Sequence, residues 1–115
     1  MLLLLTSNLQ LPTLFAQPEP ITNLSALTAT QEGEIQLNWT YPYSGTLPNG
    51  STYFIQYSTF STVEWSTQAA QIEISTEVLT TDLYQVLTVS GLQAGKEHYF
   101  RIWVSSPPGE FSQIS

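Results

Sequence analysis

The chain has 115 residues, 42% of them apolar and 10% charged, which fits one folded domain and excludes both a disordered chain and two separate cores. Nine acidic and two basic side chains give a net charge of −7, which excludes the cationic surfaces that bind nucleic acid or anionic lipid. The sequence contains no cysteine, so neither disulfides nor thiolate-bound metals stabilise the fold.

Residues 1–16 form an uncharged and mostly apolar amino-terminal segment. The segment ends with Ala16, a small residue suited to signal-peptide cleavage, although the basic residues usual at the start of a signal peptide are missing. The pattern predicts a signal peptide and hence a secreted or cell-surface protein. The alternative interpretation is an apolar leader without a targeting role. A transmembrane span is excluded, because a bilayer-crossing helix needs about 20 continuous apolar residues.

Residues 17–20, Gln-Pro-Glu-Pro, predict a linker, because proline cannot donate a backbone hydrogen bond to a strand ladder. The folded domain is expected over residues 21–115. From Ile21 onward, apolar and polar residues alternate with a period of two, which is typical of strands with one buried face. No segment shows a sustained helical period.

Five main strands and two shorter edge strands are expected after the linker. The main strands are predicted at 21–29, 35–40, 52–58, 85–90 and 98–104, and the edge strands at 63–65 and 71–74. Proline and glycine between residues 41 and 50 predict a long loop, and residues 76–82 have no clear assignment. Short strands separated by Gly/Pro turns favour an all-β fold, an antiparallel Greek-key sandwich.

The alternation also predicts which side chains form the core. One residue in two along each main strand is expected to point inward. The clearest core candidates are Trp39 on the second strand, Ile55 and Tyr57 on the third, and Phe100 and Ile102 on the last.

Four sequence features in a fixed order carry a resemblance to a known family. They are Asn23-Leu24-Ser25-Ala26 after a proline, Trp39 on the second strand, the Tyr53-Phe54-Ile55-Gln56-Tyr57 strand, and the Gly91-Leu92-Gln93-Ala94-Gly95 corner. With these features the chain resembles a fibronectin type III domain over nearly everything from Pro20 onward. The resemblance implies an immunoglobulin-like sandwich of about seven strands, with the third and sixth strands in one sheet.

Two departures from the fibronectin pattern stand out. The tyrosine that normally hydrogen-bonds across the corner falls on His98, so that bond must be replaced or lost. The seventh strand is also expected to be incomplete, because few residues follow the 105–110 loop. An incomplete strand would leave the edge of the sixth strand unpaired over Phe100 to Val104, which is a liability for aggregation.

Catalytic and metal-binding signatures are absent from the sequence, so we expect no enzyme, no cofactor and no metal. His98 is the only histidine and has no second ligand near it in the sequence, which favours a structural role. Glu73, Glu77 and Asp82 lack the spacing of a calcium loop, and a small sandwich offers no glycosidase cleft between them. A solvated acidic face is the simpler interpretation.

The candidate binding patch is aromatic and lies on the outward face of the third and sixth strands. It consists of Phe54, Tyr99 and Trp103, with Arg101 between the last two. Such a patch favours burial against a partner or stacking on a sugar. The alternative is cross-strand packing and cation–π contact that only stiffen the sheet.

These features predict a non-catalytic interaction or spacer module from a larger secreted or cell-surface protein, with neighbouring domains in a longer chain. The alternative is an accessory domain of an extracellular carbohydrate-active enzyme, which the aromatic patch encourages. The partner is expected to be a protein or a polysaccharide, and not a nucleic acid.

Overall fold

The computed structural model describes residues 18–40, 50–75, 84–106 and 110–115. The predicted leader and the predicted loop at 41–49 lie outside these residues, as do residues 76–83. Residues 18–20 of the predicted linker take no regular secondary structure. Among the described residues, none of the helices has the length and apolar character needed to cross a membrane.

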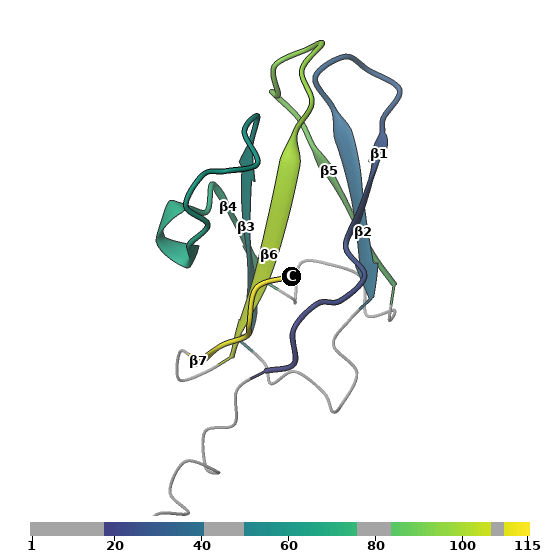
Figure 1. The fold of residues 1–115 in the computed structure, drawn as a ribbon. Helices are drawn as coiled ribbons and strands as arrows, with labels where there is room; N and C mark the ends of the chain where they lie inside the picture. The colour runs from purple at the N-terminus through teal and green to yellow at the C-terminus, as the bar shows by residue number, and fades with distance from the viewer. Residues whose placement is uncertain (1–17, 41–49, 76–83, 107–109) are drawn as a thin grey trace, which may run out of the picture.

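The protein is a sandwich of two antiparallel sheets that face each other across one core (Figure 1). Three strands form the first sheet in the order β1-β2-β5, and four form the second in the order β4-β3-β6-β7. The strands are β1 (Ser25–Thr28), β2 (Ile35–Thr40), β3 (Thr52–Ser58), β4 (Ile72–Ser75), β5 (Tyr84–Val89), β6 (Tyr99–Ser106) and β7 (Glu110–Phe111). The predicted Greek-key β-sandwich is confirmed.

The first strand is shorter than the predicted range of 21–29, because the residues before it attach to β2 through a side chain. The amide of Asn23 donates from Nδ2 to Thr40 Oγ1 at 2.6 Å, and its Oδ1 accepts from the backbone N–H of Thr40 at 3.0 Å. An asparagine side chain offers both a donor and an acceptor, so it replaces a ladder pair. Ile21 lies outside any strand but is buried in the core.

One predicted edge strand is wrong. Residues 63–65 alternate in sequence but lie in the long connection between β3 and β4, which also holds the short 3-10 helix η3 (Thr67–Ala69). Their backbone bonds to a glutamine side chain rather than to another strand. The other predicted edge strand, at 71–74, is confirmed as β4, which pairs with β3.

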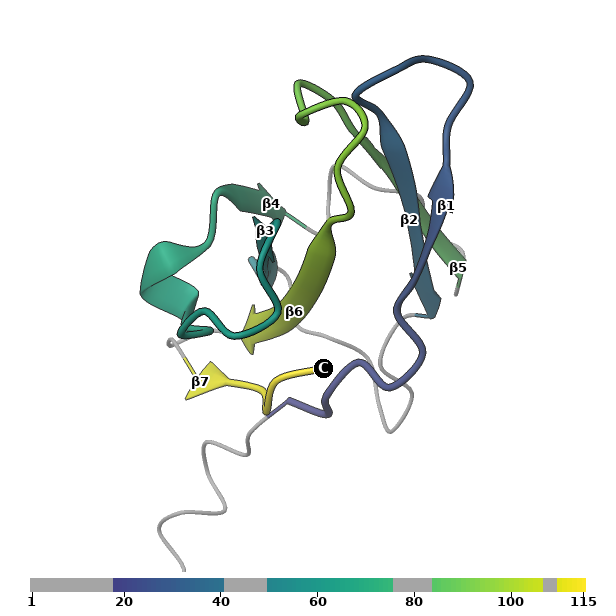
Figure 2. The same ribbon diagram turned by 45° about the horizontal axis from the view of Figure 1, so that its top comes forward.

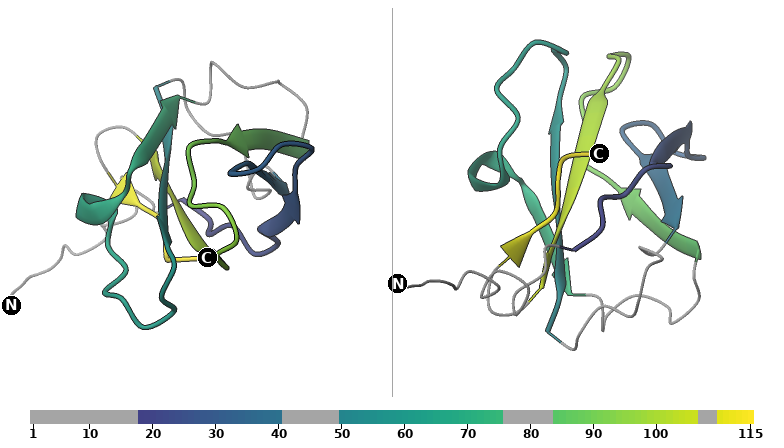
Figure 3. Two further views of the ribbon diagram at one scale, coloured as in Figure 1. Left: turned by 90° about the horizontal axis from the view of Figure 1, so that it is seen from above. Right: turned by 60° about the horizontal axis from the view of Figure 1, so that its bottom comes forward.

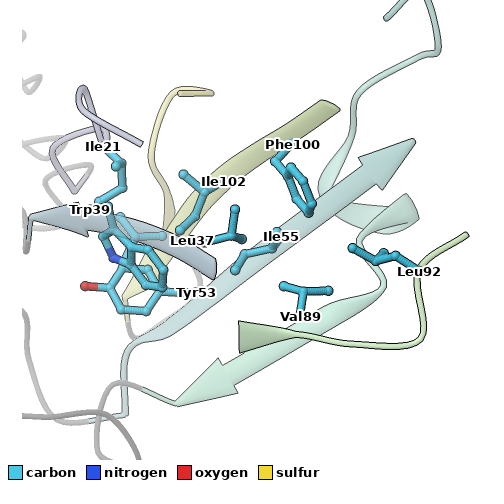
Figure 4. Packing of buried hydrophobic residues seen from close by; sticks show 10 residues of the cluster. Ile21, Leu37, Trp39, Tyr53, Ile55, Val89, Leu92, Phe100 and Ile102 are labelled. Carbon is cyan, nitrogen blue, oxygen red and sulfur yellow. The ribbon is translucent and has the colours of Figure 1, made fainter. Parts of the chain in front are cut away.

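Both sheets contribute side chains to a single core (Figure 4). Trp39 of β2 meets Tyr53 of β3 edge to face, with ring centroids 5.1 Å apart and planes at 75°. Ile55 and Ile102 are fully buried beside this pair. The expected inward set is confirmed: Trp39, Ile55, Phe100 and Ile102 are buried in the cluster, and Tyr57 packs against it while partly exposed.

The β1–β2 turn meets the β5–β6 connection at one end of the three-stranded sheet. Leu92 donates its backbone N–H to the carbonyl oxygen of Gly33 at 3.0 Å. Gly33 has a φ of +77°, and a Cβ at this position would lie 2.8 Å from Leu92 O. Glycine is therefore required here both for its backbone conformation and for the close approach of the two turns.

The tail after β7 stays along β6 (Figure 3). Ser112 and Val104 exchange two hydrogen bonds, Ser112 N to Val104 O at 2.7 Å and Val104 N to Ser112 Oγ at 2.9 Å. Ser115 and Ile102 do the same, with Ser115 N to Ile102 O at 3.2 Å and Ile102 N to Ser115 Oγ at 3.0 Å. The expected bare edge of β6 is therefore wrong at these positions, because serine hydroxyls replace the carbonyl acceptors of a regular ladder.

Candidate interaction surface

The four residues of the candidate binding patch all lie on the outer face of the four-stranded sheet. The backbone register sets them side by side across β3 and β6, in the pairs Phe54–Trp103, Gln56–Arg101 and Ser58–Tyr99. Directly opposite residues of an antiparallel pair point to the same face, so these side chains are neighbours. The structure thus brings the patch together on one surface.

Trp103 is buried, however, and is not available to a partner in this structure. Only 6% of its surface is exposed. Its cross-strand neighbour Phe54 is partly covered as well, because Phe111 of β7 packs against it edge to face at 5.2 Å between centroids. Trp103 therefore faces outward without being exposed. The candidate binding patch needs correction at this residue, because its indole is buried.

The connection between β3 and β4, residues 59–71, folds back beside the outer face of the sheet (Figure 2). Gln56, an outward-facing residue that is itself buried, holds this connection with both ends of its amide. Its Nε2 donates to the carbonyl oxygen of Glu64 at 3.2 Å, and its Oε1 accepts from Ser66 N at 2.8 Å. Gln56, which lies opposite Arg101 and was not part of the predicted patch, thus holds the β3–β4 connection on the sheet.

A second glutamine anchors the far end of the same connection. The amide of Gln71 accepts from Tyr57 N at 3.0 Å through Oε1 and donates to Tyr57 O at 2.9 Å through Nε2. These two bonds continue the pairing of β4 with β3, with a side chain in place of a backbone group. The β3–β4 connection is therefore tied to the sheet at both ends.

Arg101 lies between Tyr99 and Trp103 on β6, and its guanidinium packs on a ring of the β3–β4 connection. Its guanidinium carbon lies 5.0 Å from the ring centroid of Trp65, a residue of the β3–β4 connection. It also donates from Nη1 to the carbonyl oxygen of Phe100 at 2.9 Å. A cation–π contact at this distance stabilises the loop on the sheet.

Tyr99 points its hydroxyl toward solvent at the end of the patch. The hydroxyl donates to Glu97 Oε1 at 3.1 Å. This hydrogen bond, together with the negative charge of Glu97, raises the pKa of Tyr99 above its ordinary value of 10.0, because both favour the protonated phenol. Among the four patch residues, Tyr99 and the partly exposed Phe54 and Arg101 retain contact with solvent.

Three residues of this surface were missed from the sequence: Gln56, Trp65 and Phe111. Trp65 fell in the edge strand predicted at 63–65, and the seventh strand, which holds Phe111, was expected to be incomplete. The sequence carries no signal for them, because the burial of the Gln56 amide, which requires hydrogen-bond partners from another segment, is evident only in the structure.

His98 replaces the corner tyrosine and has a structural environment. Its Nδ1 lies 3.0 Å from the carbonyl oxygen of Lys96, and its ring packs near those of Tyr57 and Phe100 at 6.5 Å in both cases. An imidazole with the proton on Nδ1 donates to that carbonyl, so a local bond stands where the tyrosine bond was expected.

The acidic residues show no convergence in the described part of the chain. Glu73 is exposed on β4, opposite Phe54, while Glu77 and Asp82 lie outside the described residues. Within residues 18–40, 50–75, 84–106 and 110–115, no three His, Cys, Asp or Glu side chains come close enough to hold a metal ion.

A comparison with models of protein families finds no match, and a comparison with curated proteins finds no similar sequence. Among solved structures, the chain is similar to module A71 of titin from human cardiac muscle, with a TM-score of 0.56 and 20% sequence identity. The similarity covers 87% of this chain and 86% of the titin module. At this level of identity the likeness concerns the fold alone, and it shows an immunoglobulin-like or fibronectin-type β-sandwich.

Proposed function

We propose that this protein is a non-catalytic interaction or spacer module within a longer chain. The observation that supports this role best is the single core shared by both sheets, in which Trp39 and Tyr53 pack across the sandwich. Such a core gives a stiff body whose stability does not depend on the loops that it displays. The fold that it shares with a titin module is compatible with this role.

We infer further that the module is of the fibronectin type III kind. In constant-type immunoglobulin domains the fourth strand joins the sheet of the first, second and fifth strands. Here β4 pairs with β3 in the other sheet. This topology, together with Trp39 and the glycine-rich corner around Leu92, supports the fibronectin assignment.

Secretion or surface display belongs to the same proposal and depends on residues 1–16. Expression of the full chain in a secreting host, followed by mass spectrometry of the exported protein, tests it. A mature chain that begins at Gln17 supports the proposal. Retention of the whole chain inside the cell contradicts it.

The carbohydrate-associated alternative loses its main support in this structure. It depended on an exposed candidate binding patch. In this structure Trp103 is buried and Arg101 packs on Trp65. We therefore propose no carbohydrate-associated role.

The spacer role is tested by pulling on a polyprotein that contains several copies of the chain. A stiff module unfolds as one unit, so each unfolding event is expected to lengthen the polyprotein by the same amount, about 300 Å. Extension without separate, equal steps contradicts a spacer that bears load. The flanking reading frame gives a second test: further sandwich repeats support the proposal, and a carbohydrate-active catalytic domain next to the module favours the accessory-domain alternative.

A further inference from the structure

The outer face of the four-stranded sheet has two halves that are covered differently. Around Arg101 the β3–β4 connection lies beside the face, and Gln56 and Trp65 hold it there. Around Phe54 the neighbouring element is β7, whose Phe111 ring meets the Phe54 ring edge to face at 5.2 Å between centroids. Both rings keep contact with solvent, and 36% of the Phe111 surface is exposed. The second half is therefore an aromatic surface that another molecule can reach.

A carboxylate lies beside this aromatic pair. Glu73 of β4 is directly opposite Phe54 in the register of β3 and β4, so both side chains point to the outer face. Glu73 is exposed, and among the described residues it forms no ion pair. The chain has only two basic residues: Arg101 packs on Trp65, and Lys96 lies in the β5–β6 connection near the β1–β2 turn. No lysine or arginine of the protein therefore neutralises this carboxylate.

The first half of the face shows which chemistry suits the second. There the protein places its own guanidinium, that of Arg101, 5.0 Å from the ring centroid of Trp65. The face of an aromatic ring attracts cations, and arginine is the more frequent cation in such contacts. A carboxylate next to the ring adds charge-assisted hydrogen bonds with the guanidinium. Phe54, Phe111 and Glu73 offer this combination but lack the guanidinium.

The charge of the whole molecule selects the same kind of partner. A net charge of −7 attracts cationic molecules and repels anionic ones before contact is made. The strands of the three-stranded sheet carry no charged residue. In the four-stranded sheet, the edge strands β4 and β7 each carry a glutamate, Glu73 and Glu110. A cationic segment is therefore expected at the four-stranded sheet and not at the other.

We propose that Phe54, Phe111 and Glu73 form a docking site for an arginine side chain on a basic, extended segment of a partner protein. The guanidinium packs on the aromatic pair, and its N–H groups donate to the Glu73 carboxylate. The proposal rests on the interaction role proposed above and gives the chemistry of the partner. The spacer role does not depend on this site and is tested by pulling, so the failure of either proposal can be recognised separately.

The test is a titration of the full chain with the peptide Gly-Arg-Gly-Arg-Gly, blocked at both ends and followed by amide NMR spectra. Shifts are expected in β3, β4 and β7, with a dissociation constant of roughly 1 mM at low salt. The constant should rise as salt is added, because salt screens exposed charges. The same peptide with citrulline in place of arginine keeps the shape without the charge. It is expected to bind at least about tenfold more weakly.

Two pairs of matched variants locate the site. Glu73→Gln is expected to raise the dissociation constant about fivefold. Glu32→Gln, in the β1–β2 turn, makes the same change in net charge and should alter the constant less than about twofold. Phe111→Leu removes a ring but keeps an apolar side chain, and is expected to raise the constant about threefold. Phe60→Leu makes the same change at an exposed ring of the β3–β4 connection and should have no effect.

The spectra also show whether each variant is folded. Weakening by Glu73→Gln and Phe111→Leu, but not by their controls, supports the proposal. Absence of shifts up to about 10 mM peptide overturns it. Equal binding of the citrulline peptide indicates an apolar contact, and equal weakening by Glu73→Gln and Glu32→Gln indicates attraction by net charge alone; either result overturns the proposal. A Phe111→Leu variant that binds as tightly as the natural chain also overturns it.

Discussion

The two sheets of this sandwich come from strands with the same alternating pattern, yet their outer faces are very different. On the four-stranded sheet, the outward side chains of β3 and β6 are covered by the β3–β4 connection and by β7, so that Trp103 is 6% exposed. On the three-stranded sheet, Leu27 is 59% exposed and Tyr84 57%. The exposed large apolar side chains of the three-stranded sheet thus lie on its edge strands β1 and β5, whereas the outward aromatic residues of the four-stranded sheet are packed against segments that return over it.

The same contrast holds at the edges. β6 is shielded by β7 and by the serine hydroxyls of the tail, and β4 carries Glu73. β1 and β5 have neither a covering segment in the described chain nor a charge. Among the described residues, one side of the molecule is therefore closed by its own segments, while the strands at the other side, β1 and β5, carry no charge.

The largest expected effect on stability comes from comparing one aromatic residue from each outer face. Trp103→Ala is expected to reduce the free energy of unfolding by about 3 kcal/mol, because it removes a buried indole. Tyr84→Ala is expected to reduce it by about 0.5 kcal/mol or less, since that ring is mostly in water. Urea unfolding followed by circular dichroism measures both. Similar losses for the two variants would show that the outer faces are equally packed, which contradicts the contrast.

A smaller effect is expected from the amide that holds the β3–β4 connection. Gln56→Ala leaves the carbonyl of Glu64 and the N–H of Ser66 without their partner and should cost about 2 kcal/mol. Gln93→Ala, in an exposed turn, is the matched control and should cost less than about 0.5 kcal/mol. Hydrogen exchange should also accelerate in residues 59–71 of the Gln56 variant alone. Unchanged exchange there would mean that the connection is held by other contacts.

The shielded edge of β6 gives the next prediction. Ser112→Ala removes the hydroxyl that accepts from Val104 N and is expected to cost about 1 kcal/mol. Ser90→Ala, just after β5 and exposed, should be neutral within about 0.5 kcal/mol. Thermal unfolding of the two variants under the same conditions compares them. A neutral Ser112→Ala would indicate that the backbone of the tail, rather than its hydroxyls, protects β6.

The smallest effect concerns Tyr99 at the rim of the covered face. Its raised pKa means that the folded state holds the phenol proton more tightly than the unfolded state does. The contribution of this bond to stability is therefore constant at neutral pH and is lost only as pH rises through the raised value above 10.0. Glu97→Gln should lower the pKa of Tyr99, as read from the pH dependence of its ring resonances by NMR. A pKa that does not fall would assign the shift to something other than Glu97.

The sequence alone determined the sandwich, because its evidence is local. Alternation along β2, β3 and β6 identifies the buried face of each strand. Successive side chains of a strand point to opposite faces, so an apolar residue at every second position determines which face is buried. Trp39, Ile55, Phe100 and Ile102 were therefore recognisable as core residues before their partners across the sandwich were known. The resemblance to fibronectin type III domains also placed the third and sixth strands in one sheet.

Only the tertiary structure decided what covers each outward face and each edge. The alternation of residues 63–65 resembled a strand, but the Gln56 side chain on β3 donates a hydrogen bond to the carbonyl oxygen of Glu64. Ser112 and Ser115 showed no strand pattern, yet their hydroxyls complete the edge of β6. The physical reason is that alternation reports only the side of a strand on which a residue lies. Whether that side meets water depends on contacts between segments far apart in the sequence, which no local pattern records.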